Sequence, residues 1–261
     1  MADKVTAPSL KKMRDSNEKI VCLTAYDFPS AEIADASGVD VVLVGDSLGN
    51  VIQGQPTTVL VDLDDICYHV RIVNRAIHRA LLVADLPFGS YNVSTEQAIE
   101  SSIRIMKSGA AAVKLEGDYH DAIQQITKAG IPVMGHVGFT PQSIHNFGGA
   151  KVQGRGDRGD EILAQAKSIQ DAGAFAIVLE LIPADLATAI TEALEIPTIG
   201  IGAGSRCSGE IQVWHDIMGL SAKQHKHTKF FMNAREQMMQ AASAFTTQVR
   251  NNEFPGPENS F

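Results

Sequence analysis

Short apolar runs recur along the chain and alternate with longer stretches in which apolar residues have helical spacing. Runs of this length that are rich in Val, Ile and Leu are typical of parallel strands buried on both faces. We therefore predict eight strands with helices in the intervals. The predicted strands are residues 20–24, 40–45, 81–85, 111–116, 132–136, 175–180, 197–202 and 211–214.

A weak internal repeat supports this order of elements. Gly38, Gly109, Gly130 and Gly173 each stand between the end of a helical stretch and the start of an apolar run. Glycine is favoured there because a helix commonly ends on a residue with left-handed backbone. Each unit is thus a helix, a turn and a strand, which is half of a βα repeat. Eight such strands favour a closed (βα)8 TIM barrel over an open sheet.

The helices and the domain boundary follow from local signals. Ser94 and Gln97 have the spacing of a capping box, and a second helix is expected from about Asp62 to Val73. No Pro/Ser-rich linker divides the chain, so residues 1–261 are predicted to form one domain with a C-terminal extension from about residue 222. Residues 222–250 should form two or three helices, and the Pro-rich tail at 254–257 should be irregular.

Composition narrows the class of protein. The 261 residues are close to the roughly 250 typical of an eight-fold barrel, and 44% are hydrophobic. The net charge of −8 argues against nucleic-acid binding, which needs a concentrated basic surface. Cys22, Cys67 and Cys207 lack metal-ligand spacing and are predicted to be reduced thiols in a cytoplasmic protein. Neither a signal peptide nor a membrane span is expected.

Acidic residues stand where four of the apolar runs stop, namely Asp46, Asp85, Glu116 and Glu180. The carboxyl ends of barrel strands converge on one mouth, so these residues should share a small volume. The first three end neighbouring strands and would repel one another without a cation. Each alone could be a helix cap or an ion-pair partner. Together, as oxygen ligands without clustered His or Cys, they favour Mg²⁺.

Other polar residues of the same strand ends suggest further roles. Lys114 faces the same way as Glu116, and a buried ammonium must meet an anion, either a neighbouring carboxylate or a substrate carboxylate. Glu180 lies across the mouth, where it could be a general base or a helix N-cap. His136 could donate a hydrogen bond to a polarised oxygen or be a core histidine.

Two loops are longer than a plain barrel requires, and long loops in compact domains are commonly functional. They are residues 46–61 and 137–160, and the second is rich in Gly and contains Lys151, Arg155 and Arg158. This composition suggests a mobile cover over an anionic ligand. The Gly-rich run 199–204 is a weak signal for phosphate binding, and His225–His227 is expected to be a solvated loop.

Several segments resemble the ketopantoate hydroxymethyltransferase family, in the order of that family and over nearly the whole chain. They are LTAYD (23–27), VGDSLG (44–49), ADLPFGSY (84–91), KLEG (114–117), HVGFTPQS (136–143), GIGAG (200–204) and FPGP (254–257). The chain departs from the family at Asn50, where Met is common, and at Ser208 and Glu210, where Asp and Gln are common. The first departure concerns substrate packing, and the other two concern the connection between the last two strands.

The resemblance implies a barrel of the phosphoenolpyruvate/pyruvate superfamily that binds Mg²⁺, 3-methyl-2-oxobutanoate and 5,10-methylenetetrahydrofolate. It implies that the metal ligands are Asp46, Asp85 and, directly or through water, Glu116. The implied contacts to the keto acid are Asp46, Ser47, Asp85, Lys114 and His136, and the implied proton acceptor is Glu180.

On this hypothesis Glu180 removes the C3 proton of the keto acid, Mg²⁺ stabilises the enolate, and C3 attacks the folate methylene carbon to give 2-dehydropantoate for pantothenate synthesis. The family forms homo-oligomers, often decamers. Two alternatives are a Mg²⁺-dependent C–C lyase of the same superfamily and a catalytically silent barrel. The loop 137–160 lacks the Cys that is usual in such lyases. A silent barrel would be expected to lack one or more of the carboxylates at the strand ends, and all four are present here.

Overall fold

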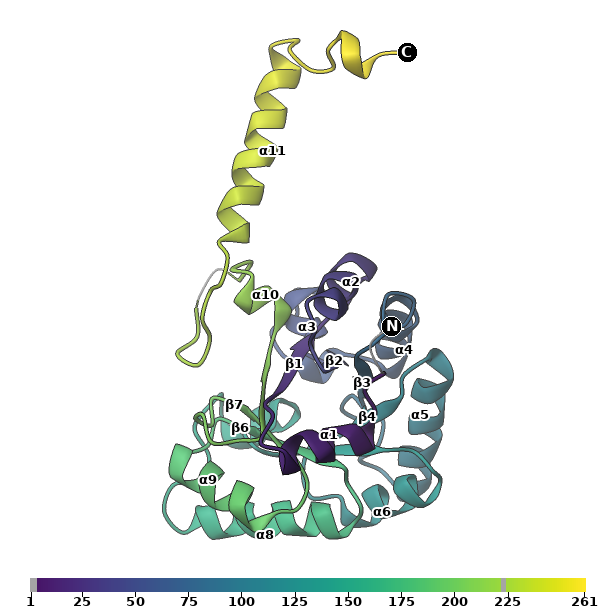
Figure 1. Ribbon diagram of the computed structural model, residues 1–261, viewed down its shortest axis with the longest axis vertical. Coiled ribbons are helices and arrows are strands. Elements are labelled where there is room, and N and C mark those ends of the chain that lie inside the picture. Colours follow the sequence, from purple (N-terminus) through teal and green to yellow (C-terminus); the bar gives the residue numbers. More distant parts are fainter. Residues whose placement is uncertain (1–3, 222–223) are drawn as a thin grey trace. The chain divides into compact units, whose positions relative to one another are not determined.

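The computed structural model describes residues 4–221 and 224–261. Eight parallel strands pair in sequence order and close on themselves, which confirms the barrel and excludes the open sheet (Figure 1). The strands are β1 Ile20–Thr24, β2 Val41–Val44, β3 Leu81–Asp85, β4 Ala112–Lys114, β5 Val133–Gly138, β6 Ala176–Glu180, β7 Thr198–Ile201 and β8 Gly209–Gln212.

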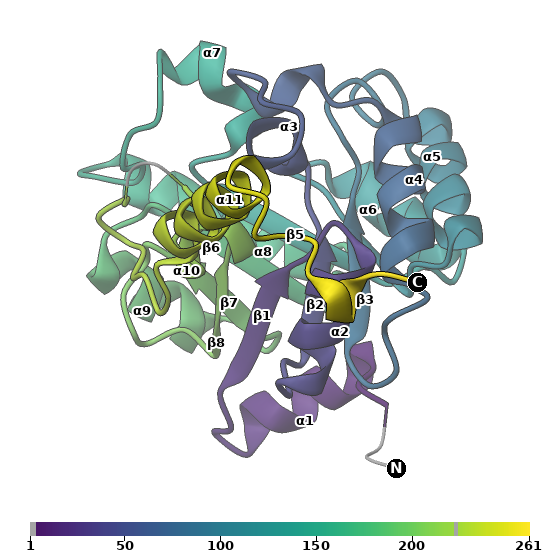
Figure 2. The same ribbon diagram turned by 90° about the horizontal axis from the view of Figure 1, so that it is seen from above.

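Helices connect most of the strands and lie on the outside of the barrel, as α4, α5 and α6 show beside β3 and β4 (Figures 1 and 2). One interval differs from the prediction, because the connection between β7 and β8 contains no helix. The connecting helices are α2 Phe28–Ala36, α3 Leu48–Val51, η1 Thr58–Leu60, α4 Leu63–Val73, α5 Thr95–Ser108, α6 His120–Lys128, η2 Pro141–Ser143, α7 Ile144–Phe147, α8 Arg158–Asp171 and α9 Ala184–Ala193.

Alternate residues of the strands fill the inside of the barrel. Helix α1, Ala7–Asp15, was not predicted, and it covers the amino end of the strands. Its fully buried Leu10 packs with the interior residues, and the Val5 N–H donates to the Arg79 carbonyl at 2.8 Å. The interior residues that it closes off are Cys22, Val41, Leu43, Leu81, Val83, Ala112, Met134, Ala176, Val178, Ile199 and Ile211.

Local predictions are confirmed in most places. The four repeat glycines have the expected left-handed φ values of 85°, 116°, 85° and 98°. Helix α4 begins after Asp62, and α5 begins after Ser94, whose hydroxyl accepts from the Gln97 N–H. The Gln97 side chain accepts from Val93 N instead of Ser94 N, so only half of the predicted capping box forms. Strand β8 begins two residues before its predicted start at 211.

The chain divides into two compact units, Met1–Val213 and Trp214–Phe261, and the whole barrel belongs to the first. The second contains α10 Trp214–Ile217, α11 Ala234–Arg250 and η3 Pro257–Asn259. In the described part of 222–250 there is one long helix, so the predicted two or three helices are wrong; residues 222 and 223 lie outside the described residues. Residues 225–227 form a loop, as expected. Within the described ranges, no helix is both long and apolar enough to cross a membrane.

Candidate active site

The side chains at the mouth of the barrel come from strand positions that point inward, one layer above the apolar core. Val83, Ala112, Met134 and Val178 are interior core residues, and the residues two positions later are Asp85, Lys114, His136 and Glu180. Side chains two apart on a strand point the same way, so these four polar side chains form the next layer above the apolar core. Strand pairing places Asp85 beside Lys114 and Gly138 beside Glu180. The predicted convergence of these strand ends is therefore confirmed.

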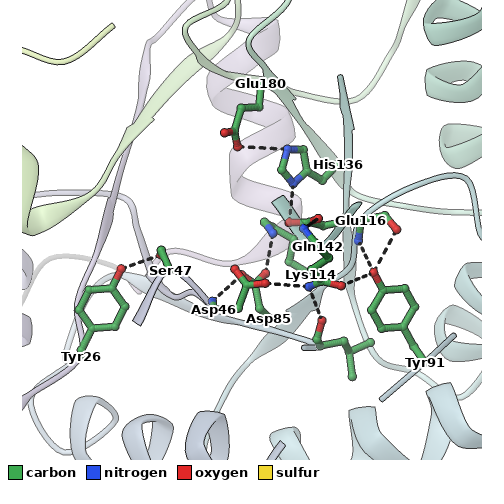
Figure 3. A network of polar contacts seen from close by, with 11 residues as sticks. Tyr26, Asp46, Ser47, Asp85, Tyr91, Lys114, Glu116, His136, Gln142 and Glu180 are labelled. Carbon is green, nitrogen blue, oxygen red and sulfur yellow. Dashed lines mark hydrogen bonds and ion pairs between the residues drawn. The ribbon is translucent and has the colours of Figure 1, made fainter. Parts of the chain in front are cut away.

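Asp46 enters this layer from the turn after β2. Its backbone N–H donates to Asp85 Oδ2 at 3.0 Å. Gly45 occupies the inward position, where a Cβ atom would lie 2.9 Å from Ser47 Oγ and 3.3 Å from Asp85 Oδ2. Only glycine leaves room there for both polar groups. The hydroxyls of Ser47 and the buried Tyr26 share a hydrogen bond of 2.7 Å (Figure 3).

Lys114 and Asp85 form a fully buried ion pair. The ammonium donates to Asp85 Oδ1 at 2.6 Å, and both side chains are at most 5% exposed. Burial acts to lower the pKa of Lys114, but the carboxylates of Asp85, Glu116 and Asp46 outweigh it and hold the pKa above its usual value. The ammonium therefore stays charged. The sequence left open whether Lys114 pairs with a neighbouring carboxylate or with a substrate carboxylate. In this structure it pairs with the neighbouring carboxylate of Asp85.

Glu116, His136 and Glu180 form a chain of contacts across the mouth (Figure 3). His136 Nδ1 lies 3.5 Å from Glu116 Oε1, and His136 Nε2 lies 3.4 Å from Glu180 Oε2. Neither ring nitrogen is aligned for a hydrogen bond with a described residue, so these contacts are electrostatic. Burial acts to lower the pKa of His136, but the two carboxylates raise it to about 9. The histidine is then an imidazolium at neutral pH.

Two residues of this network, Gln142 and Tyr91, were not predicted as site residues. Gln142 Nε2 donates to Asp46 Oδ2 at 2.9 Å, and its backbone N–H donates to Glu116 Oε2 at 3.0 Å. The Tyr91 hydroxyl donates to Gln142 Oε1 at 2.7 Å. Both lie in segments 84–91 and 136–143 of the resemblance, which was the only signal in the sequence that pointed to them.

Backbone geometry holds Glu180 at the rim. Gly138 has φ +96°, and a Cβ there would lie 2.3 Å from the Glu180 carbonyl oxygen. Leu181, the next residue after Glu180, has the unusual φ of 46°, and its carbonyl accepts from Gln153 N at 2.9 Å. The Glu180 side chain is 17% exposed, which makes it the most accessible acid of the mouth.

The long loop after β5 contributes less charge to the site than its sequence suggested. Lys151, Arg155 and Arg158 are all exposed, and no side-chain contact with the mouth is found for them within the described residues. The loop instead contributes Gln142, and the segment around Gln153 is anchored beside Leu181. A role for the three basic residues in covering a ligand stays a prediction.

The donor set fits a divalent cation. Burial, followed by the charges of Asp85 and Glu116, raises the pKa of Asp46 well above its usual range, which means that the ionised cluster lacks positive charge. With all four carboxylates ionised, two cations, Lys114 and His136, face them and two negative charges are left for a bound cation to balance. Asp46 Oδ1 accepts no hydrogen bond from the described residues, and an oxygen of this kind can bind a metal.

The three predicted metal ligands do not, however, converge as a ready cage. Among the described residues, no group of three or more His, Cys, Asp or Glu side chains is arranged to hold a metal ion alone. Both Glu116 oxygens face protein groups, one Gln142 N–H and one His136 nitrogen. Mg²⁺ commonly takes one or two carboxylates and completes its shell with waters and substrate oxygens, so the aspartate pair alone suits it.

Comparison with known proteins identifies relatives over the whole chain. A family model described as ketopantoate hydroxymethyltransferase matches residues 4–257. A 3-methyl-2-oxobutanoate hydroxymethyltransferase of Chloroflexus aurantiacus is 51% identical, covering 98% of this chain and 92% of its own. One of Rhodococcus jostii is 50% identical, covering 97% of this chain and 89% of its own.

Solved structures with the same fold are much more distant in sequence. Phosphoenolpyruvate phosphomutase of Streptomyces platensis has a TM-score of 0.65 at 15% identity, covering 95% of this chain and 88% of that chain. 2,3-Dimethylmalate lyase, a member of the PEP mutase/isocitrate lyase superfamily, has a TM-score of 0.60 at 17% identity, covering 98% and 91%. These likenesses confirm the predicted fold class.

Proposed function

Because the chain belongs to the ketopantoate hydroxymethyltransferase family, we propose how its mouth residues perform that family's transfer. The chain is a transferase that adds a hydroxymethyl group to 3-methyl-2-oxobutanoate, a step of pantothenate synthesis, as its relatives at about 50% identity are named. The 2,3-dimethylmalate lyase, in contrast, shares the fold at only 17% identity. The observation that carries the proposal is the buried carboxylate cluster with two unbalanced negative charges and one more accessible acid at its rim.

Asp46 and Asp85 would bind Mg²⁺ directly, and Glu116 would bind it through water. The unengaged Asp46 Oδ1 supports direct binding by Asp46. Asp85 and Glu116 each have both oxygens opposite protein groups, so the direct role of Asp85 and the water-mediated role of Glu116 follow from the family resemblance. Phosphonopyruvate hydrolase, which shares the fold with a TM-score of 0.63 at 14% identity, was solved with oxalate and Mg²⁺. Oxalate and a 2-oxo acid both present oxygens on adjacent carbons. Bound there, the ion would supply Lewis-acid stabilisation of charge on the 2-oxo group.

The keto acid would lie against Ser47, Lys114 and His136 at the mouth. The Ser47 hydroxyl is held by Tyr26 at 2.7 Å, so that it is positioned to meet a substrate oxygen. Lys114, whose pKa is held above its usual value, offers a permanent positive charge to the carboxylate. These contacts would orient the substrate so that C3 faces the rim.

Glu180 would remove the proton from C3 of the keto acid. A general base must reach its substrate, and Glu180 is the most accessible acid of the cluster. The imidazolium of His136, 3.4 Å away, keeps its carboxylate oriented. The bond that forms joins C3 to the methylene carbon of 5,10-methylenetetrahydrofolate. The two bonds from that carbon to the folate nitrogens break, and a water supplies the hydroxyl group. The other proton of this water and the proton from C3 go to the two nitrogens, and tetrahydrofolate leaves.

A homo-oligomer, often a decamer in the family, is part of the proposal. Helix α11 has one apolar face, which another subunit could cover. Its apolar residues recur at three- to four-residue spacing and are Met238, Ala242, Phe245 and Val249. Light scattering of the purified protein measures its mass directly. A monomeric mass of 28 kDa would contradict an oligomer.

The role of Glu180 is tested by deuterium exchange at C3. With Mg²⁺ and keto acid bound, Glu180→Gln should slow exchange roughly 10²- to 10⁴-fold, because the amide cannot accept the proton. Glu195→Gln makes the same substitution at an exposed position. This matched control should exchange at the wild-type rate. Wild-type exchange in Glu180→Gln would remove Glu180 from the role.

The shared metal and substrate site is tested at Asp85. Calorimetry of Asp85→Asn should show weakened binding of Mg²⁺ and of the keto acid together, because one side chain holds the metal and the Lys114 ammonium. Weakened binding of only Mg²⁺ or only the keto acid would contradict a shared site. A folate-coupled turnover assay then measures the complete reaction.

A further inference from the structure

Gln142 lies at the start of the long loop after β5, yet its side chain is nearly buried within the mouth. We propose that Gln142 is a positioning residue that holds Asp46 and Glu116 in the geometry that receives Mg²⁺, and that Tyr91 acts through it. This inference rests on the proposed metal site. It assigns a role to two uncharged residues that touch neither the metal nor the substrate in that proposal.

The orientation of the Gln142 amide is fixed by its neighbours. Nε2 lies 2.9 Å from Asp46 Oδ2 and 3.0 Å from the Leu86 carbonyl oxygen; the carbonyl can only accept, and so can the aspartate when it is ionised. Oε1 lies 2.7 Å from the Tyr91 hydroxyl, which can donate. Each amide hydrogen thus has an acceptor, and the reverse orientation would place the amide oxygen against two acceptors. The contacts are visible together in Figure 3.

Through these bonds one residue connects the ends of several strands. Asp46 follows β2, Leu86 follows β3, and Glu116 follows β4, while Gln142 itself follows β5. The Tyr91 hydroxyl also contacts the backbone of Glu116, its carbonyl at 3.1 Å and its N–H at 3.3 Å. Asp46 and Glu116, which are 70 positions apart in sequence, are therefore held by the two donors of a single residue.

The choice of a neutral donor has a consequence for metal binding. Asp46 and Glu116 repel each other when both are ionised, and the two donors of Gln142 hold them in place against this repulsion. Lys or Arg in this place would also restrain them, but it would neutralise the charge that attracts the cation. An amide restrains the carboxylates and leaves their charge intact. Outer-shell groups of this kind typically change metal affinity by about 10–100-fold.

The direct test is Gln142→Met, which keeps a similar length and removes both polar atoms while the backbone N–H to Glu116 remains. We expect the dissociation constant for Mg²⁺, measured by calorimetry on the folded protein, to rise about 10–100-fold. At saturating Mg²⁺ the turnover number should return close to wild type, because no group that touches substrate has changed. Gln165→Met, an exposed glutamine of α8, is the matched control and should leave the affinity unchanged.

Tyr91→Phe provides a second, milder variant. It removes the hydroxyl that holds Gln142 Oε1 and should weaken Mg²⁺ binding several-fold, because one hydrogen bond to the amide is lost. In the Gln142→Met background the same change should have little effect, because Tyr91 acts through the missing amide. Additive effects in the double variant would contradict the coupling. If Gln142→Met fails to fold, the Mg²⁺ affinity of Tyr91→Phe decides alone, and an unchanged affinity overturns the inference.

The outcome also separates this inference from the proposed metal site. Wild-type protein that binds no Mg²⁺ would overturn the metal site and this inference with it. Wild type that binds Mg²⁺ with undiminished affinity in Gln142→Met overturns the inference alone. A lower melting temperature in Gln142→Met with unchanged Mg²⁺ affinity would show a purely structural role, and this too would overturn it.

Discussion

The two ends of the barrel both bury acidic side chains, and they treat them in opposite ways. At the amino end, Asp35 and Asp40 lie beside Arg79, close to the starts of β2 and β3. At the mouth, Asp46, Asp85 and Glu116 lie where β2, β3 and β4 end. All five side chains are less than 9% exposed, so burial alone does not distinguish the two groups.

The amino-end acids are saturated by donors. Asp35 accepts hydrogen bonds from the backbone N–H groups of His78, Arg79 and Ala80 at 2.7–3.2 Å. Asp40 accepts from the Arg79 guanidinium at 2.8 Å and from the Val21 N–H at 3.0 Å. Such donors fix the turns that lead into the strands. This is what a structural carboxylate needs, since an unpaired buried charge is costly.

Asp46 has fewer donors than either amino-end acid, and the mouth acids repel one another. Asp46 Oδ1 accepts no hydrogen bond within the described ranges, and the pKa of Asp46 is raised by burial and by its acidic neighbours. The cluster therefore stores unfavourable charge that a cation would relieve. The buried acids of the amino end, whose oxygens all accept hydrogen bonds, are therefore structural, whereas Asp46, a buried acid with an oxygen left free, is a candidate functional acid. Burial alone does not separate the two.

The largest effect is expected for Asp46→Asn, which removes a charge from the mouth. Activity should fall by about 10³-fold or more, because several kcal/mol of metal-dependent stabilisation are lost. The melting temperature of the metal-free protein should instead rise, by about 2–4 °C if the relieved repulsion is about 1 kcal/mol. Turnover and calorimetric melting are measured beside the exposed control Asp171→Asn. A large loss of metal-free stability would contradict the comparison.

The opposite result is expected for Asp35→Ala at the amino end. The substitution removes the acceptor of three backbone N–H groups, that of Ala80 buried and those of His78 and Arg79 partly buried, and we expect a loss of about 3 kcal/mol in the free energy of unfolding. That corresponds to a fall of about 6–12 °C in melting temperature. Turnover per folded molecule should match that of the control Asp171→Ala. Reduced Mg²⁺ affinity in the folded variant would show that the two ends are coupled.

Much of the fold and of the mouth could be predicted because both follow from local patterns. Apolar runs identified the strands, and the period of two places Asp85, Lys114, His136 and Glu180 directly above core residues. The acids at the ends of the runs then had to meet, because parallel strands share one carboxyl edge.

The parts that were missed depend on contacts that no local pattern reveals. Gln142 and Asp46 are 96 positions apart, and an uncharged side chain in a loop gives no sign of burial. Helix α1 was missed because it is short and its capping box uses Ser9 instead of Glu or Gln. The β7–β8 connection has no helix, whereas the repeat suggested one in every interval.

The smallest effect, and the finest test of the comparison, is expected for Arg79→Lys. The Arg79 guanidinium donates to Asp40 at 2.8 Å and to the carbonyls of Gly38 and Val39 at 3.1 and 2.8 Å, and it is 31% exposed. Lysine keeps the charge but cannot reach all three acceptors at once. We expect a loss of about 1 kcal/mol, or about 2–4 °C in melting temperature, with unchanged turnover and Mg²⁺ affinity. The exposed Arg75→Lys is the control. A stability equal to wild type would mean that charge alone holds the amino-end acids, and that the geometry of their donors contributes nothing.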